Sequence, residues 1–404
     1  MSGGTIDLRC SCGRTYHADP AHAGKLIRCR CGRTIRVRVP RQRRLGGSAA
    51  SRLGGWGAQR LKVVASFWRR PGVLARAFPR ATRYAPLLAW AYLAGVIGAT
   101  LALRLFGDRW PPATALLFGP RWLLLVPVPL LVILAVLFRP ALLLPVLGGL
   151  GVALGPAMGY RTGWRTWLGA GTGSLRIITY NIDWSRNPGP TLIPNELSRL
   201  DPDVMVFQEC NPIMREPAHW PAGWTVRADG SICLGSRYPI LLETADSAAE
   251  VGDLGDTGIA RFFRLEGPEG PIEIAVVHLE TPRKGLETLR YSGDISRMDP
   301  STLVRSIGSS RVRRWVGRQS GDVIVAGDFN MPVESVIYRK DWSDCRNAFS
   351  TVGRGFGYTR ILRRFSVRID HVLTCGEGWT PVRAFVGPDL GSDHLPLIVD
   401  LKRR

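Results

Sequence analysis

An acid and an amide stand two residues apart where one apolar run ends. The run Val323–Ala326 is followed by Gly327, Asp328, Phe329 and Asn330. Because side chains alternate across a strand, Asp328 and Asn330 are expected on one face and Phe329 on the other. Carboxylate and amide oxygens suit Mg²⁺, which binds one or two carboxylates and leaves its remaining positions to water and phosphate. The spacing therefore predicts part of a site for a divalent metal and a phosphate.

Three more apolar runs end in side chains that can bind metal or phosphate or transfer a proton. The runs and their endings are Ile177–Tyr180 with Asn181, Val204–Phe207 with Gln208 and Glu209, and Ala275–Val277 with His278. Taken singly, each ending is explained equally well by a turn or by a satisfied structural residue. Their repetition at strand ends favours one composite site.

The elements that must position these residues begin at Leu175, where short β-rich runs alternate with Gly, Pro and Asp. The predicted strands are Leu175–Ile182, Val204–Gln208, Ser231–Leu234, Ala260–Leu265, Ile272–His278, Val323–Ala326, Ile369–Thr374 and Leu395–Leu401. Helical patterns lie between some of them, including Leu192–Leu200 and Leu303–Arg318. The pattern indicates one separate domain that mixes strands and helices.

Six motifs of this domain, in order, resemble those of the endonuclease/exonuclease/phosphatase family. They are Thr179-Tyr180-Asn181-Ile182, Gln208-Glu209, His278-Leu279, Gly327-Asp328-Phe329-Asn330, Arg368-Ile369-Asp370-His371 and Ser392-Asp393-His394. The resemblance covers about residues 174–402, and six motifs in order are far more specific than any one of them. It implies an α+β fold, built as a four-layer α/β/β/α sandwich, that hydrolyses phosphate esters with a metal-activated water.

The resemblance also implies which residues hold the metal, expected to be Mg²⁺ or Mn²⁺. Glu209 would be the main ligand, and Asn181 and Asp393 would help to hold metal or phosphate. A bound metal lowers the pKa of its water and offsets charge on the phosphoryl oxygens. These three residues are therefore the predicted metal ligands.

Five further residues receive catalytic roles from the same resemblance. Asp328 would orient or deprotonate the attacking water, and Asn330 would align that water with the phosphate. His278 and His394 would bind phosphoryl oxygens and stabilise their developing charge. Asp370 would hydrogen-bond His394, because a carboxylate behind an imidazole fixes the tautomer of the ring.

The amino-terminal 40 residues contain two copies of Cys-x-Cys-Gly. The four cysteines are Cys10, Cys12, Cys29 and Cys31. Four thiolates on two tight turns match the needs of a tetrahedral Zn²⁺ site, and the segment resembles a small zinc ribbon. Zinc ribbons normally use Cys-x-x-Cys, so four reduced cysteines without a metal are the alternative. We expect residues 1–40 to be a structural or adaptor module.

The positive charge of the chain is concentrated outside the predicted catalytic domain. Residues 1–82 carry 18 Lys/Arg and 2 Asp/Glu, or +16 of the net +22, whereas residues 174–404 carry 29 of each sign. A strongly basic protein often binds nucleic acid through its phosphates. Here the excess falls on a basic linker, residues 41–82, whose composition suits anionic lipid headgroups.

Three uncharged apolar runs separate the linker from the catalytic domain. Tyr84–Leu103, Trp122–Phe138 and Pro140–Tyr160 contain 20, 17 and 21 residues. Roughly 20 apolar residues cross a bilayer as a helix. Residues 83–160 are therefore predicted to be a membrane region with about three transmembrane helices, the last two forming a kinked hairpin. The alternative for that hairpin is a buried core pair.

The basic flank before the first run places the N-terminus in the cytoplasm. Three crossings would put residues 174–404 on the extracytoplasmic side of the cell membrane, whereas two would return them to the cytoplasm. Outside the cytoplasm, the four cysteines of the domain could form disulfides, although their spacing does not require it. They are Cys210, Cys233, Cys345 and Cys375.

Family resemblance does not choose a substrate, so three functions remain open. The first is a membrane-anchored phosphoesterase for mono- or diesters, acting on a lipid-linked phosphate or pyrophosphate at the cell envelope. Its grounds are the membrane tether, the neutral domain and the short connection Arg165–Ser174. The second is an endonuclease or exonuclease acting on nucleic acid. The third, a non-catalytic envelope binding or signalling protein, is disfavoured by the complete set of acids and histidines.

Overall fold

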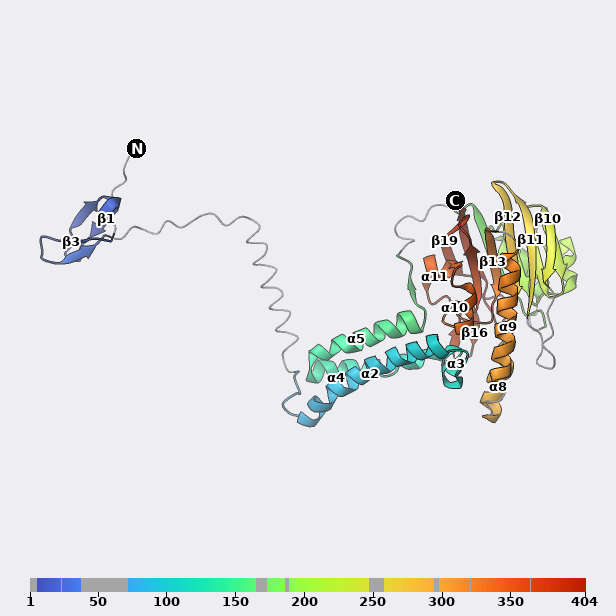
Figure 1. The fold of residues 1–404 in the computed structure, drawn as a ribbon, viewed down its shortest axis with the longest axis horizontal. Coiled ribbons are helices and arrows are strands. Elements are labelled where there is room, and N and C mark those ends of the chain that lie inside the picture. The colour runs from blue at the N-terminus through green and yellow to red at the C-terminus, as the bar shows by residue number, and fades with distance from the viewer. Residues whose placement is uncertain are drawn as a thin grey trace. The chain divides into compact units, whose positions relative to one another are not determined.

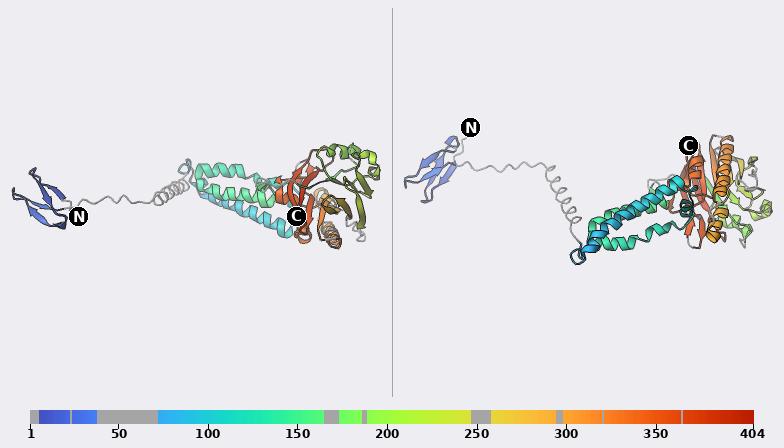
Figure 2. Two further views of the ribbon diagram at one scale, coloured as in Figure 1. Left: turned by 90° about the horizontal axis from the view of Figure 1, so that it is seen from above. Right: turned by 60° about the horizontal axis from the view of Figure 1, so that its bottom comes forward.

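The structure is a computed structural model in which the chain forms two compact units, Met1–Arg69 and Arg70–Arg404 (Figures 1 and 2). The described residues are 6–22, 24–37, 72–164, 173–185, 189–246, 258–293, 298–319, 321–363 and 365–404. Most of the predicted basic linker, residues 41–82, lies outside the described residues. So does most of the predicted connection Arg165–Ser174.

The amino-terminal unit contains two short β-hairpins with matching turns. Its elements are β1 (Ile6–Arg9), β2 (Thr15–Ala18), η1 (Pro20–His22), β3 (Leu26–Arg28) and β4 (Thr34–Arg36), with β1 paired to β2 and β3 to β4. In each turn the carbonyl oxygen of a cysteine, Cys10 or Cys29, accepts a 2.9 Å hydrogen bond from the glycine three residues on. Those glycines have φ angles of 90° at Gly13 and 85° at Gly32, a conformation that favours glycine.

The two matching turns bring four sulfur atoms together. Cys10 and Cys29 are buried, Cys12 and Cys31 are exposed, and all four Sγ atoms lie within 4.8 Å of one another. The Cys10–Cys31 and Cys12–Cys29 sulfur pairs are 3.7 and 3.6 Å apart. Tetrahedral ligation at about 2.3 Å requires sulfurs about 3.8 Å apart. The cluster therefore has the spacing that one zinc ion needs.

Three apolar segments at the start of the second unit are long enough to cross a membrane. They are Pro79–Phe106, Arg121–Phe138 and Pro140–Ala157, in agreement with the three predicted runs. Their helices pack against one another (Figures 1 and 2). The elements are α2 (Pro79–Phe106), α3 (Pro111–Leu117), η2 (Arg121–Leu125), α4 (Val128–Phe138), η3 (Pro140–Leu142), α5 (Leu143–Val152) and the π-helix η4 (Ala153–Ala157).

Two six-stranded sheets follow, together with several helices, so the domain is of mixed α/β type. The first sheet has the order β10 (Ile240–Asp246), β11 (Ile259–Gly267), β12 (Gly270–His278), β13 (Val323–Asp328), β18 (Asp370–Cys375) and β14 (Arg346–Asn347). The second has the order β19 (Trp379–Val386), β20 (Leu397–Arg403), β6 (Leu175–Asn181), β7 (Val204–Gln208), β9 (Ile232–Ser236) and β8 (Thr225–Asp229).

Shorter elements complete the domain. The helices are η5 (Pro190–Leu192), α7 (Ile193–Ser198), η6 (Pro212–Arg215), η7 (Pro217–His219), α8 (Arg283–Ser292), α9 (Met298–Gly317), α10 (Val336–Trp342) and α11 (Ala348–Val352). Two small antiparallel pairs are β5 (Arg161–Thr162) with β15 (Arg354–Gly355) and β16 (Arg360–Leu362) with β17 (Phe365–Val367).

Strand β13 shows why its sequence is apolar without interruption. Ile324 and Ala326 belong to a core cluster built from strands of both sheets. Val323 and Val325 belong to a second cluster, which α9 and α10 complete on the other face. Both faces of the strand are therefore buried, and such strands contain continuous apolar runs. Strand β6 follows the same rule, since its second face packs with α7.

The helical region and the predicted catalytic domain share part of one core. Leu103, Leu117 and Phe118 belong to the same buried cluster as Phe329 and Trp342. Packing therefore crosses the boundary expected between residues 83–160 and residues 174–404.

Candidate active site

Five strands deliver predicted site residues to one edge of the two sheets. In the second sheet β6 and β7 run parallel, and Asn181 lies opposite Gln208. In the first sheet β12 and β13 run parallel, and His278 lies opposite Asp328. The antiparallel strand β18 places Asp370 on the other side of Asp328. The strand ends that sequence analysis singled out are thus neighbours in space.

Alternation along the strands turns these side chains toward the space between the sheets. Asp328 lies two residues after Ala326 and His278 two residues after Val276, and both apolar residues belong to the core that the sheets share. Side chains two residues apart point to the same face. Phe329 is buried in the other cluster, as predicted.

A single amide joins the two carboxylates that come from different sheets. Asn181 Nδ2 donates to Glu209 Oε1 at 2.9 Å and to Asp328 Oδ2 at 3.2 Å. His278 Nε2 lies 3.7 Å from that Glu209 oxygen and 3.9 Å from that Asp328 oxygen. Two carboxylate oxygens and an imidazole nitrogen therefore converge around Asn181.

A second cluster contains the predicted Asp–His pair. His394 Nδ1 lies 2.8 Å from Asp370 Oδ2, and His394 Nε2 lies 3.8 Å from Asp328 Oδ2. All three side chains are at most 1% exposed. The imidazole thus bridges Asp370 and Asp328, and Asp370 holds the ring in position.

The mutual burial of these groups shifts their protonation. Burial by itself lowers the pKa of His394, but the carboxylates of Asp370 and Asp328 outweigh it and raise that pKa to about 9. Burial, followed by the charge of Asp370, raises the pKa of Asp328 above its ordinary value. Burial also acts to raise the pKa of Asp370, but the adjacent His394 holds it below the usual range. His394 is therefore a cation near neutral pH, paired with Asp370.

Two site residues adopt a backbone conformation that is rare outside glycine. The φ angles are 54° at Glu209 and 49° at Asn330, and such residues concentrate at functional sites. Asn330 N donates to Asp328 Oδ1 at 2.8 Å, and Asn330 Nδ2 donates to the carbonyl oxygen of Leu279 at 2.8 Å. Asn330 therefore fixes the Asp328 carboxylate to the chain segment that follows His278.

Asp393, one of the predicted metal ligands, lies beside an arginine that sequence analysis missed. Arg360 Nη2 donates to Asp393 Oδ2 at 2.8 Å, and Arg360 Nη1 lies 3.4 Å from His394 Nε2. Arg360 follows Thr359, whose hydroxyl accepts hydrogen bonds from the backbone N–H groups of Ile369 and Asp370. None of the six motifs contains Arg360, so sequence analysis had no signal for it.

The donor atoms at this edge fit a hard divalent cation. Glu209 and Asp328 each turn a carboxylate oxygen to the same amide nitrogen of Asn181, and carboxylate oxygens are the preferred ligands of Mg²⁺. Ligand atoms of Asp328, Asp370 and His394 also lie within 4.8 Å of one another. In that group His394 Nδ1 and Asp370 Oδ2 pair with each other. Among the described residues, buried Asp370 Oδ1 has no hydrogen-bond partner.

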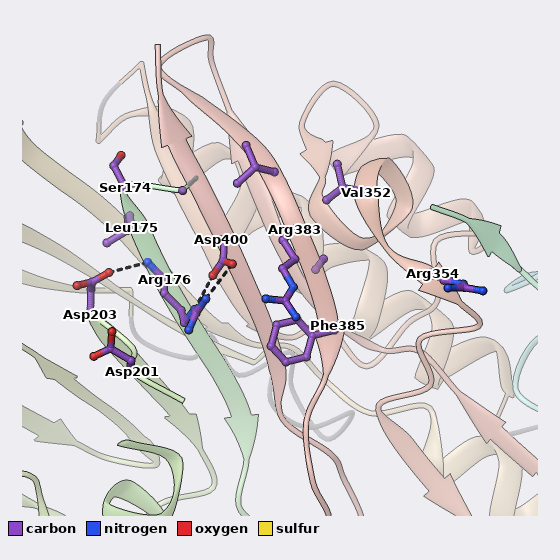
Figure 3. Close-up of a pocket in the computed structure, with 13 residues that line it drawn as sticks. Ser174, Leu175, Arg176, Asp201, Asp203, Val352, Arg354, Arg383, Phe385 and Asp400 are labelled. Carbon is purple, nitrogen blue, oxygen red and sulfur yellow. Dashed lines mark hydrogen bonds and ion pairs between the residues drawn. The ribbon is translucent and has the colours of Figure 1, made fainter. Parts of the chain in front are cut away.

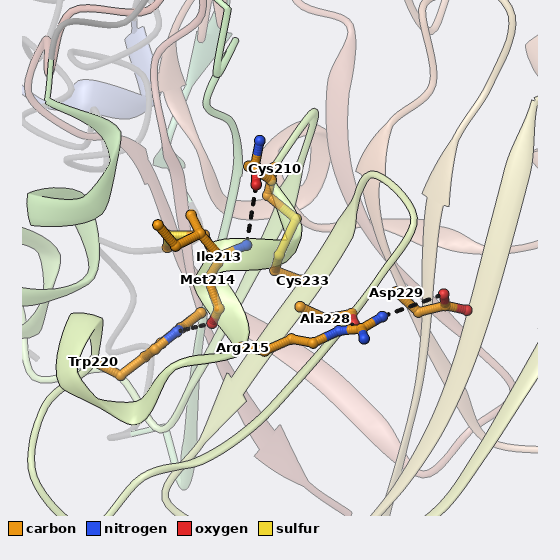
Figure 4. The surroundings of a disulfide bond; sticks show 9 residues. Cys210, Ile213, Met214, Arg215, Trp220, Ala228, Asp229 and Cys233 are labelled. Carbon is orange, nitrogen blue, oxygen red and sulfur yellow. Dashed lines mark hydrogen bonds and ion pairs between the residues drawn. A yellow bond between two sulfur atoms is a disulfide. The ribbon is translucent and has the colours of Figure 1, made fainter.

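A disulfide lies directly after Glu209. Cys210 is bonded to Cys233 of β9, and Figure 4 shows the bond above the chain segment of Met214 and Arg215. The second disulfide joins Cys345 to Cys375 at the end of β18. The first bond ties the Glu209 segment to the neighbouring strand.

A hollow in the described part of the chain lies away from these residues. It has a volume of about 870 Å³ and lies at the start of β6, five residues before Asn181 (Figure 3). Within it Arg176 forms an ion pair of 2.6 Å with Asp400, so these opposite charges satisfy each other. The candidate active site is therefore the set of strand ends where acids and histidines converge, because no histidine lines this hollow and its Asp400 is already paired with Arg176.

Several solved structures are similar to this chain. A crystal structure of D. rerio TDP2 humanized by 14 mutations is 16% identical, with a TM-score of 0.44, covering 56% of this chain and 98% of that one. An endonuclease/exonuclease/phosphatase from Bacteroides vulgatus is 17% identical, with a TM-score of 0.44, covering 57% and 99%.

A 3'-5' exonuclease (NExo) from Neisseria meningitidis is 16% identical, with a TM-score of 0.41, covering 56% of this chain and 100% of that one. A comparison with curated proteins finds no match. Residues 178–394 match the Endonuclease/Exonuclease/phosphatase family, and this range spans more than half of the chain and contains all six motifs. The chain therefore belongs to the endonuclease/exonuclease/phosphatase family.

Proposed function

We propose that this protein is a membrane-anchored, divalent-metal-dependent phosphoesterase that hydrolyses a lipid-linked phosphate or pyrophosphate at the cell envelope. The observation that carries the hydrolytic part is the convergence of Glu209, Asp328 and His394 at one sheet edge, with Asp370 behind the imidazole. In this proposal the two sheets and their covering helices act as a four-layer α/β/β/α sandwich that holds these residues rigidly.

In the proposed reaction Asp328 accepts a proton, and His394 stabilises the negative charge on the phosphoryl oxygens. Asp328, whose pKa burial raises, can accept a proton from an attacking water, and Asn330 holds its carboxylate in position. His394 carries positive charge near neutral pH and can offset the charge that develops on phosphoryl oxygens. His278 lies on the Glu209 side and can contact the same phosphate from the other flank.

The proposed metal site uses Glu209 as its main ligand, with Asn181 and Asp393 beside it. When bound, Mg²⁺ or Mn²⁺ would activate water and neutralise phosphoryl charge. Asn181 orients Glu209 through its amide nitrogen, and Arg360 holds Asp393. The chain thus offers the metal carboxylates whose positions are already fixed.

The outer surface of the helical region supports the membrane part of the proposal. Large apolar side chains are exposed along all three helical segments; they include Leu87, Leu88, Trp90, Ile97, Leu101, Leu130, Ile133, Val136, Leu144 and Leu147. A helix that is apolar on every side needs protein or lipid around it. Trp110 and Trp122, about half exposed near the catalytic domain, are residues typical of a membrane–water interface.

The pairing of cysteines supports an extracytoplasmic catalytic domain. The four cysteines after the helices form two disulfides, and the four before them are free. Disulfides persist in oxidising compartments and are rare in the cytosol. This division is what an odd number of crossings would produce.

Thiol labelling can test on which side of the membrane the catalytic domain lies. Tyr291 is 78% exposed on the catalytic domain, so Tyr291→Cys adds a reachable thiol. We expect a membrane-impermeant maleimide to label this variant in intact cells. Labelling only after permeabilisation would place the domain in the cytoplasm and contradict the proposed topology.

We further propose that the N-terminal cysteine cluster binds a structural zinc ion and takes no part in hydrolysis. Elemental analysis of the purified chain is expected to find about one Zn²⁺, as four thiolate ligands require. The double change Cys12→Ser/Cys31→Ser should remove the zinc and leave the turnover rate unchanged. Zinc retention in that variant would show that the cluster is not the ligand set.

A substrate panel tests the proposed function itself. The intact chain in detergent or bilayer discs, with Mg²⁺ or Mn²⁺, is offered a lipid pyrophosphate, a sphingomyelin-like phosphodiester and plasmid DNA side by side. We expect turnover of a lipid-linked ester above that of DNA. Preferential cleavage of DNA would replace the lipid proposal with the nuclease alternative, and no turnover of any ester would favour a binding protein on the same fold.

A further inference from the structure

One buried carboxylate of the helical region holds the start of a helix in the catalytic domain. Asp108 lies in the turn between α2 and α3, and its side chain is fully buried. Its Oδ2 accepts hydrogen bonds from Ser335 Oγ and Val336 N, both at 2.7 Å, and from Ile337 N at 3.3 Å. These donors stand at the N-terminus of α10, where backbone N–H groups lack partners within the helix. Asp108 therefore supplies, from outside the domain, the hydrogen-bond acceptor that the N-terminus of α10 needs.

The same carboxylate is the ion-pair partner of a buried arginine. Asp108 Oδ1 lies 3.2 Å from Arg305 Nη1 of α9, and Arg305 is 1% exposed. The ring of Phe118, also from the helical region, lies 5.1 Å from the guanidinium carbon. Loss of Asp108 alone would leave the buried charge of Arg305 without its carboxylate, which is strongly unfavourable.

A second buried ion pair joins the residue before Ser335 to the helical region. Arg121 Nη1 donates to Glu334 Oε2 at 2.9 Å, and the two side chains are 9% and 6% exposed. The same guanidinium donates to the carbonyl oxygens of Leu117 and Ala157, at distances between 2.6 and 3.2 Å. Arg121 thus ties Glu334 to two separate segments of the helical region.

The two residues that the helical region holds, Glu334 and Ser335, stand only a few positions after the candidate catalytic residues. Glu334 and Ser335 come four and five residues after Asn330, in a segment whose Met331 is fully buried. The carbonyl oxygen of Met331 lies 3.0 Å from His371 Nε2. The segment is therefore held at both ends, by the strand that ends in Asp328 and by the helical region.

We infer that Asp108 and Arg121 are positioning residues for Asp328 and Asn330, so that the helical region sets the geometry of the active site as well as anchoring it. The inference rests on the proposed phosphoesterase function. Rigid support matters because a misplacement of about 1 Å can cost about 100-fold in rate. The helical region and the segment that follows Asp328 then form one rigid support for the active site.

Two paired substitutions in the full chain test this inference by removing both partners of each ion pair. Arg121→Met/Glu334→Met replaces one ion pair by apolar side chains, an exchange that buried pairs often tolerate. Asp108→Asn/Arg305→Gln removes the charges of the other pair and keeps polar side chains of similar shape. The matched control is Arg176→Met/Asp400→Met, which removes a partly buried ion pair between the start of β6 and the middle of β20.

The readouts separate positioning from stability. Well below the melting temperature, we expect each test variant to lose about 10- to 100-fold in kcat on a soluble phosphodiester with Mg²⁺, with KM changed less than about twofold. Hydrogen exchange across residues 329–338 should become faster. The control should keep the parental kcat and exchange. A lower melting temperature with kcat and exchange at parental values would overturn the inference.

The exchange measurement distinguishes this inference from the proposed function. If the parent chain hydrolyses no phosphate ester, the proposed function fails, and the exchange of residues 329–338 alone decides the inference. Faster exchange there in both test variants, with the control unchanged, would still support the role of Asp108 and Arg121. Unchanged exchange would overturn it.

Discussion

Asp328→Asn is expected to lower kcat by about 10²- to 10⁴-fold, the range typical for loss of a general base. The variant keeps the size of the side chain and an oxygen that can accept from Asn330 N. It removes the one carboxylate that contacts Asn181 and approaches both His278 and His394. Steady-state kinetics with saturating metal measure the loss.

Folding should survive this change, so the loss can be assigned to chemistry. Burial and the charge of Asp370 disfavour the ionised form of Asp328, and a neutral amide removes that cost. The hydrogen bond that Asn181 donates to Asp328 must be rearranged in the variant, which offsets part of that gain in stability. We expect the free energy of unfolding to change by no more than about 1.5 kcal/mol. The matched control Asp400→Asn changes a carboxylate in the middle of β20 that pairs with Arg176, and it should keep its activity. An equal loss there would contradict a local role for Asp328.

Asp370→Asn and His394→Gln should each lower kcat by about 10²- to 10⁴-fold, because the two groups act as one unit. Asp370 contacts the Nδ1 side of the ring, and its charge keeps His394 protonated despite burial. Without that carboxylate, burial favours a neutral ring. The phosphoryl group would then lose a cationic partner.

The double variant provides the sharper measurement. If His394 works only through its pairing with Asp370, the double change should cost little more than the larger single change. A double-mutant cycle on kcat measures this coupling. Losses that multiply would show that the two residues act independently and would contradict the paired arrangement.

The sequence predicted the interior of the sheets better than their edges. Each of the eight predicted strands is present, with ends that differ by at most two residues. The strands that sequence analysis missed in the two large sheets are β8, β10, β14 and β19, which are the four edge strands. Interior strands are buried on both faces and have continuous apolar sequences. Edge strands lack this signal, and Pro381 within β19, where the pairing register shifts, lowers its strand signal further.

The strand-end residues could be predicted as a group because strand alternation and order decide where they meet. Asn181, His278, Asp328 and Asp370 follow apolar runs or open them, and parallel pairing places their ends together. Arg360 could not be found in this way, since it stands on a short strand paired only with another short strand. Arg360 approaches Asp393 through an isolated β-bridge between Arg360 and His394. No periodic pattern in the sequence predicts this bridge.

The contacts between the helices and the domain were also beyond prediction. Asp108 and Arg121 flank predicted membrane segments, where charged residues usually mark only the ends of a span. Their partners Arg305 and Glu334 lie about 200 residues away in sequence. Pairing over such separations depends on tertiary packing. The disulfides are similar, because four cysteines allow three pairings and spacing does not choose among them.

The most direct test of the account is the metal dependence of phosphate-ester hydrolysis by the intact chain. Turnover of the best ester in the panel is measured after chelation and then across a titration with Mg²⁺ or Mn²⁺, in parallel with Asp328→Asn. We predict no turnover after chelation, full recovery with metal, and no comparable recovery in the variant. Turnover that persists without metal, or that Asp328→Asn leaves intact, would contradict the account.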